Sequence, residues 1–287
     1  MTNRLALAQT LVSGTVTLQG IPYSFTASAS GTAMGSNVSE AKKSATVASN
    51  SAAVTAARAS IDKILADNSA ILSDLEITSL ISNNFTTTVR VFKPLGLEKI
   101  ATTTDGINYF TNKETTIQSD QWLTVPNGKT LTFNAPGKNS GYLQIGDGTT
   151  SGNATVNSNA PYSNDTFVYV YPGALLNINF PFTNEIYAAI LSDGTVNINN
   201  GGYVYNGGTA SSVQSYDTLK IDSNSHIQNS GDSSYVIALN SVTNYGSIYC
   251  SPGYESYVAL SYDNKTQKFL LVGNMPQGSC PVVAVVT

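Results

Sequence analysis

The chain has 287 residues, 11% of them charged, and a formal net charge of −4. Ordinary soluble domains carry about 25% charged residues, so the polarity of this chain comes from Asn, Thr, Ser and Gly instead. This balance argues against nucleic acid as the main partner, because phosphate binding needs clustered Lys and Arg and no arginine follows Arg90.

Residues 1–92 have the pattern of a small α+β hairpin-helix module. Apolar residues alternate on either side of a turn at Gln19-Gly20, and the side chain of Ser36 or Asn37 can cap a helix that follows. The predicted elements are a hairpin over residues 12–33, a long helix over 38–66, a short helix over 70–81 and a strand over 86–92.

The long helix carries two stripes of small or apolar residues that would suit assembly. Alanines recur at alternating spacings of four and three, and a second stripe has residues seven apart. Such spacing permits close packing between helices, so both stripes are candidate assembly contacts. The alternative is that the helix lies on its own hairpin and buries the second stripe. The candidate residues are Ala41, Ala45, Ala48 and Ala52 in the first stripe, and Val47, Val54 and Ile61 in the second.

From residue 122 onward the chain repeats a short strand-like motif, an apolar residue between polar neighbours. Successive copies lie 25, 20, 20, 23 and 23 residues apart. A repeat of this length is typical of a solenoid, in which stacked units bury one continuous core. The central apolar residues of the copies are Leu131, Val156, Leu176, Val196, Leu219 and Val242.

Each repeat contains three short strands, which predicts a parallel β-helix. One set of strands is the repeated motif, a second includes Tyr203–Asn206 and His226–Asn229, and a third includes Phe167–Val170. The expected fold is mainly β, with a parallel β-helix of about six rungs of 20–25 residues after the small α+β module. The expected parts are an assembly or anchoring module over 1–92, a linker with the first strands over 93–121, the β-helix over 122–256 and a capping hairpin and strand over 257–287.

Two cysteines and an apolar final strand bear on how the β-helix ends. Cys250 and Cys280 are too few for a disulfide framework, so one bridge closing the C-terminal segment and two free, buried thiols both remain open. Residues 281–286 are apolar throughout. This strand either caps the coil, as a solenoid requires, or is buried against another subunit.

The repeats over residues 122–256 resemble those of parallel β-helix proteins, a class that includes pectin-degrading enzymes, phage tailspikes, adhesins and ice-binding proteins. Enzymes of this class use acid–base groups that the repeats lack, since His226 is the sole histidine and Lys220 is isolated. We therefore predict no enzymatic activity, no cofactor and no metal site. His226 is expected to point outward, in the position that Tyr203 occupies one repeat earlier.

Two further sets of side chains are expected on the outer faces. A column of Thr and Ser, interrupted at Leu175, precedes the central apolar residues, and we attribute it to the β-propensity of Thr rather than to ice binding. Aromatic rings stack on sugars or pack in interfaces, so exposed tyrosines are the better candidates for binding. The structural alternative is that the rings stack on one another. The candidate residues for binding a glycan or a partner are Tyr203, Tyr205, Tyr245 and Tyr249.

Residues 14–59, the hairpin and alanine-rich helix, resemble modules in giant-virus particle proteins. The resemblance implies a virion surface or minor capsid protein, and the lack of a recognisable signal peptide agrees with a particle assembled inside a cell. We expect a non-enzymatic structural protein of a particle or cell surface that forms a homo-oligomer, such as a trimer, and contacts other surface proteins. The alternatives are an adhesin-like protein that attaches to host glycans and, less favoured, a polysaccharide lyase or hydrolase. No apolar run approaches the about 18 residues of a membrane helix, so no membrane insertion is expected.

Overall fold

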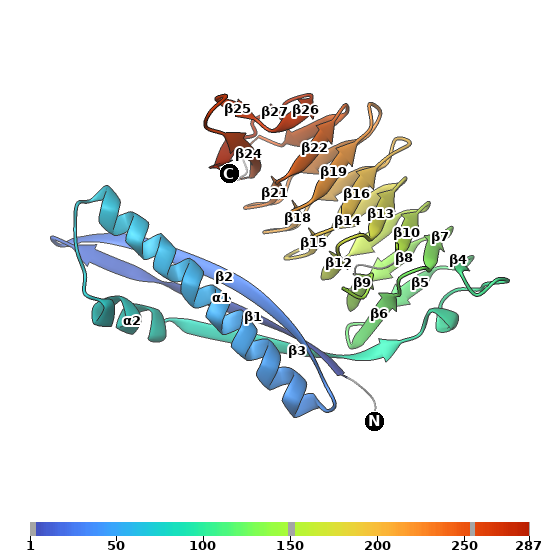
Figure 1. Cartoon of the computed structure of the whole chain (residues 1–287), viewed down its shortest axis with the longest axis horizontal. Helices are drawn as coiled ribbons and strands as arrows, with labels where there is room; N and C mark the ends of the chain where they lie inside the picture. Colours follow the sequence, from blue (N-terminus) through green and yellow to red (C-terminus); the bar gives the residue numbers. More distant parts are fainter. Residues whose placement is uncertain (1–3, 149–152, 253–255, 287) are drawn as a thin grey trace. The chain divides into compact units, whose positions relative to one another are not determined.

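The computed structural model describes residues 4–148, 153–252 and 256–286 (Figure 1). The chain divides into two compact units, Met1–Pro94 and Leu95–Thr287, and each has its own buried apolar residues. The fold is mainly β, and its larger part is a parallel β-solenoid, as the repeats predict.

The N-terminal unit consists of a long hairpin, a third strand and two helices. Its elements are β1 (Arg4–Leu18), β2 (Ile21–Gly35), α1 (Val38–Asp67), α2 (Asp74–Ser82) and β3 (Phe85–Leu95). The turn at Gln19-Gly20 has positive φ angles of 52° and 84°, which matches the right-handed twist of the strands it joins. Asn37 caps α1 by accepting a hydrogen bond from the backbone N–H of Glu40. The predicted hairpin, both helices and the strand are confirmed.

α1 packs on the hairpin through every fourth residue, which neither predicted stripe describes. Residues four apart advance by about 40° around a helix, so the buried row winds about α1 and follows the twist of β1 and β2. The expectation that this packing buries the valine stripe is wrong, because Val47 is 62% exposed and Val54 is 39% exposed. The buried residues of α1 are Ala41, Ala45, Ser49, Ala53, Ala57, Ile61 and Leu65.

The helix approaches β2 so closely that two positions of the strand require glycine. A Cβ atom at Gly31 would lie 2.5 Å from the backbone nitrogen of Ser49, and one at Gly35 would lie 2.5 Å from that of Ala41. Small residues on α1 and β2 therefore face each other, and the contact leaves no room for a valine in this row.

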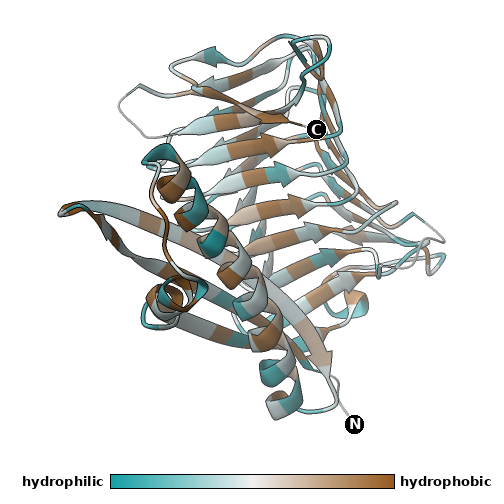
Figure 2. Cartoon of the chain, turned by 60° about the vertical axis from the view of Figure 1, so that its left-hand side comes forward, coloured by the Kyte–Doolittle hydropathy of each residue, from teal (hydrophilic) through white to brown (hydrophobic). Residues whose placement is uncertain are grey.

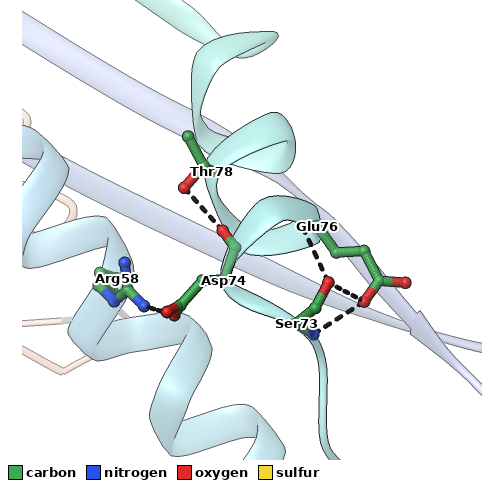
Figure 3. Close-up of polar contacts among 5 residues, drawn as sticks. All are labelled: Arg58, Ser73, Asp74, Glu76 and Thr78. Atoms are coloured by element: carbon green, nitrogen blue, oxygen red, sulfur yellow. Dashed lines mark hydrogen bonds and ion pairs between the residues drawn. The ribbon is translucent and has the colours of Figure 1, made fainter.

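α2 begins with a capped first turn, and an ion pair joins it to α1 (Figure 3). Ser73 Oγ accepts a hydrogen bond from the backbone N–H of Glu76, while Glu76 Oε2 lies 2.8 Å from the backbone nitrogen of Ser73. Asp74, the first residue of α2, pairs with Arg58 of α1. The apolar contact is made by Ile77 and Ile81, which are buried in the same cluster as Ile61 and Leu65 of α1.

The C-terminal unit is a solenoid whose rungs each contain one strand from each of three sheets, called sheets B, C and D here, and strands of successive rungs pair in parallel. Sheet B contains β6 (Gln121–Val125), β9 (Tyr142–Ile145), β12 (Phe167–Val170), β15 (Ala189–Ser192), β18 (Ser212–Ser215), β21 (Tyr235–Ala238), β24 (Tyr257–Asp263), β25 (Lys268–Phe269) and β28 (Val282–Val286). Sheet C contains β4 (Asn108–Thr111), β7 (Thr130–Phe133), β10 (Thr155–Ser158), β13 (Leu175–Ile178), β16 (Thr195–Ile198), β19 (Thr218–Ile221), β22 (Ser241–Asn244) and β26 (Leu271–Gly273). Sheet D contains β5 (Thr115–Ile117), β8 (Gly137–Asn139), β11 (Tyr162–Asn164), β14 (Pro181–Asn184), β17 (Tyr203–Asn206), β20 (His226–Asn229), β23 (Ser247–Cys250) and β27 (Gln277–Gly278).

The solenoid makes about seven turns rather than the six expected. The sequence motif missed the first and last strands of sheet C. In β4, Tyr109 and Phe110 replace the aliphatic and polar pair of the motif, and the last strand, β26, ends on Gly273. A short 3₁₀ helix, η1 (Leu97–Lys99), precedes the first rung, and Leu97 is buried in the solenoid core.

Successive strands pair in register, so equivalent residues form columns along the solenoid. The six apolar residues of the sequence motif are all buried in sheet C, as expected. Apolar segments recur at equivalent places in neighbouring strands (Figure 2). The predicted hydroxyl column is confirmed and consists of Thr130, Thr155, Thr195, Thr218 and Ser241, with Leu175 between the second and third.

A ladder of five buried asparagines runs along the end of the sheet D strands. Each side-chain amide donates to the side-chain oxygen of the next, with distances of 2.9, 2.8, 2.8 and 2.7 Å from nitrogen to oxygen. Three of them also donate to the carbonyl at the start of the sheet B strand one rung farther on, as Asn184 does to Ser212 at 3.0 Å. At these three positions the ladder ties the corner between sheets D and B to the next rung. Its members, all 0% exposed, are Asn139, Asn164, Asn184, Asn206 and Asn229.

The two cysteines form a disulfide bridge, which decides between the two alternatives left open by the sequence. Cys250 occupies the next position of the asparagine column after Asn229, and Cys280 lies two residues before β28. The bridge spans 30 residues and holds the final rung to β23. In the chain-entropy treatment, a loop of this length stabilises the fold by about 3 to 4 kcal/mol.

Replacing Asn184 with alanine is expected to destabilise the solenoid by about 3 kcal/mol, because Asn164, Asn206 and the Ser212 carbonyl each lose a buried partner. Asn177→Ala is the matched control, since Asn177 belongs to a half-buried asparagine row on the outer face of sheet C and water can replace its hydrogen bonds. Denaturant unfolding of both variants checks the difference. Equal destabilisation would show that burial of the ladder adds nothing.

Candidate binding face of the solenoid

The outer face of sheet D gathers three of the four predicted binding tyrosines. Tyr205 and Tyr249 lie in one column with Gln228 between them, and Tyr203 lies in the neighbouring column beside His226. Alternate residues of each strand point inward and are buried, so these side chains are on the opposite face. We call Tyr203, Tyr205, His226, Gln228 and Tyr249 the aromatic–amide strip.

Tyr203 and His226 stack on each other across adjacent rungs. Their ring centroids lie 4.9 Å apart and the ring planes differ by 7°. This confirms the outward position expected for His226 and also shows that the structural alternative, stacking between rungs, holds for Tyr203. Partial burial of the imidazole lowers the pKa of His226 from its ordinary value.

Tyr205 and Tyr249 are two rungs apart, which corresponds to about 10 Å along the sheet. Tyr205 is half-buried and Tyr249 is 37% exposed. Gln228 fills the position between them, and its amide nitrogen lies 2.9 Å from Ser230 Oγ and 3.4 Å from Ser251 Oγ. Two phenol rings flanking an amide and two hydroxyl groups offer both stacking surfaces and hydrogen-bonding groups.

Tyr245 is not part of the strip. It lies in the short connection from β22 to β23 and is 58% exposed, and its carbonyl oxygen accepts a hydrogen bond from the side chain of Asn274 at 3.0 Å. The sequence grouped Tyr245 with Tyr249 because both were expected to be exposed. The corner of the solenoid separates them onto different surfaces.

A second aromatic cluster, on sheet B, was not singled out from the sequence. Tyr169 donates to the carboxylate of Asp193 and packs edge-on against Tyr171, with centroids 4.6 Å apart. Farther along the sheet, the amide of Gln214 donates to Tyr235 at 2.9 Å, and Tyr235 stacks on Tyr257 at 5.2 Å. The sequence does show tyrosines in the third set of strands, but it does not reveal that these tyrosines share columns with polar residues.

The predicted assembly residues fall on two different sides of α1. Ala41, Ala45 and Ile61 are buried within the N-terminal unit. The other four, Ala48, Ala52, Val47 and Val54, are exposed. Exposed apolar residues continue around the start of α2, where Ile71 is 92% exposed and Leu75 is 79% exposed. A groove beside Val54 is lined also by Arg58, Thr78, Ile81, Ser82 and Phe85.

Among the residues described, no three His, Cys, Asp or Glu side chains come together as metal ligands would. None of the described helices is long and apolar enough to span a membrane. Comparison with protein-family models, with curated proteins and with solved structures finds no match for the chain.

The partial burial of His226 should make stability depend on pH. The folded state holds the pKa of His226 below its ordinary value of 6.5, so the unfolded chain binds more protons as the pH falls through that value. We expect the free energy of unfolding to decrease between about pH 7 and about pH 5, and His226→Gln to remove this part of the decrease. Because His226 is the sole histidine, identical pH profiles for the two proteins would contradict the assignment.

Proposed function

We propose that this protein is a non-enzymatic structural protein of a particle or cell surface. Its N-terminal unit serves for attachment and assembly, and its solenoid is the displayed part. The observation that carries the proposal is the aromatic–amide strip on a rigid sheet face, where rings, amide and hydroxyl groups lie in register on successive rungs. Recognition at this face would be binding of a glycan, as in an adhesin.

The way in which the solenoid is stabilised supports a surface location. Its polar side chains are mainly amides and hydroxyls that bond to one another along the coil, so few charges are needed for stability. The Cys250–Cys280 bridge fits an oxidising environment outside the cytosol, where disulfides form and persist. Both features favour a protein that stays folded when it is exposed.

Glycan recognition at the strip would use ring stacking on Tyr205 and Tyr249. We expect an array of neutral and acidic glycans to identify a ligand, and Tyr205→Ala or Tyr249→Ala to weaken its binding by about tenfold, because each removes a stacking surface worth about 1 kcal/mol or more. Titration by calorimetry measures the change.

Tyr245→Ala is the matched control for these variants, since Tyr245 is an exposed tyrosine of the same solenoid outside the strip. Its affinity should equal that of the unaltered chain. Failure of the intact protein to bind any glycan on the array, or an equal loss in the Tyr245 variant, would count against glycan recognition at this face.

A second observation favours assembly through the N-terminal unit. The exposed side of α1 presents Val47 and Val54, and Ile71 and Leu75 add exposed apolar area. Exposed apolar surface of this kind marks contacts with other proteins. The particle that we propose is a virion, in which the chain would be a surface or minor capsid protein. The resemblance of residues 14–59 to giant-virus particle modules supports that choice.

Assembly through α1 predicts a change of mass when its exposed valines become charged. We expect the full chain to form a homo-oligomer such as a trimer, and the double variant Val47→Glu, Val54→Glu to dissociate it, because burial of two carboxylates is unfavourable. Light scattering measures the mass. Ile186→Glu, at a solenoid position that is 59% exposed, should leave the oligomer intact. An unchanged mass in the α1 variant would exclude this helix as the contact.

A further inference from the structure

The last rung of the solenoid ends in open strand edges. β26, β27 and β28 pair on one side with β22, β23 and β24, and no described strand pairs with their other side. The backbone N–H and C=O groups that point along the axis at this end therefore have no strand partner among the described residues. The final strand, β28, closes the coil by pairing with β24, but its other edge has no partner among the described strands.

The edge of β28 lacks two of the features by which proteins prevent edge-to-edge association. Such edges are normally protected by charged side chains, proline within the strand, or a bulge. β28 has the sequence Val-Val-Ala-Val-Val from Val282 to Val286, so it contains no charged side chain and no proline. Val283 is 47% exposed and Val286 is 60% exposed, whereas Val282 packs against the solenoid core.

The sequence of β28 is symmetric about Ala284, and this points to the occupant of the edge. In antiparallel pairing of two copies centred on Ala284, Val282 lies opposite Val286 of the other copy and Val283 lies opposite Val285. Four of the five pairs are then valine opposite valine, which suits an extended strand, and the central pair is alanine opposite alanine. We propose that the C-terminal rung is a homodimer interface in which β28 pairs antiparallel with β28 of a second copy.

The remaining strands of the rung fit the same symmetry. A two-fold axis through the middle of β28 and the opposite corner of the three-sided coil exchanges the sides formed by sheets C and D. β26 of one copy then faces β27 of the other, and the contact is the same patch on both copies. The exposed side chains of Val272 and Met275, which lie on or beside β26, would be partly covered by this contact.

The disulfide makes the edge rigid before a partner binds. Cys280 ties the chain just ahead of Val282 to β23, so β28 does not have to be ordered during association. Binding to a preformed edge avoids the entropy cost of fixing a loose strand. This interface does not involve α1, and it stands whether or not the attachment role proposed for the N-terminal unit is correct.

The test uses the full chain in sedimentation experiments over a range of concentrations. We expect Ala284→Lys to raise the dimer dissociation constant by about a hundredfold or more, because two lysines would meet at the symmetry axis. Ala66→Lys, at an exposed alanine of α1, should leave this association unchanged. Loss of the α1 contact through Val47→Glu and Val54→Glu should also leave it unchanged, which separates the two assembly proposals.

Cross-linking tests the register independently of any effect of lysine on folding. Opposed residues of an antiparallel pair have Cα atoms about 4.5 to 5.5 Å apart, within the range of a disulfide. We expect Ala284→Cys to give a covalent dimer under mild oxidation and Val286→Cys to give none, since position 286 lies opposite 282. A chain that sediments as a monomer at all concentrations, or equal cross-linking at both positions, would overturn the proposal.

Discussion

The buried asparagine ladder is the interaction on which the solenoid depends. Parallel strands supply hydrogen bonds along each sheet, but the corners between sheets leave polar groups without partners. Asn164 and Asn184 each donate to the next asparagine of the column and also to a backbone carbonyl one rung farther on, so these corners are tied to the rung that follows. Because the ladder is fully buried, its bonds act in a medium of low dielectric and losing one member leaves several groups unpaired. The in-register columns of the outer faces follow from this fixed repeat.

The same repeat explains why a chain with few charges can present a defined surface. Each outer position recurs on every rung at a constant spacing, so a tyrosine, a glutamine and a second tyrosine in one column form a continuous strip. The stacking of Tyr203 on His226 shows that neighbouring side chains in a column also contact each other. What remains exposed, mainly Tyr249 with the half-buried Tyr205, is the part that a ligand could reach.

The ends of a repeat present a different problem from its interior. The asparagine column ends at Cys250, which forms a disulfide bridge with Cys280. The bridge anchors a final strand that is apolar and symmetric about Ala284. The N-terminal unit achieves stability in another way, by placing α1 on a glycine-containing strand at very short range. The proposed attachment through α1 and the proposed pairing through the last rung are compatible, since they use different residues.

The sequence by itself determined the elements and the solenoid, because helix caps, turn residues and a repeat near 22 residues are local or periodic signals. It also placed the hydroxyl column and His226, since both follow from aligning the repeats. Only the tertiary structure decided which face of α1 is buried, because the twist of the hairpin selects a row with a spacing of four that leaves Val47 outside. The pairing of the two cysteines and the separation of Tyr245 from Tyr249 were likewise decided in three dimensions, where solenoid corners redirect neighbouring residues and rungs join distant ones.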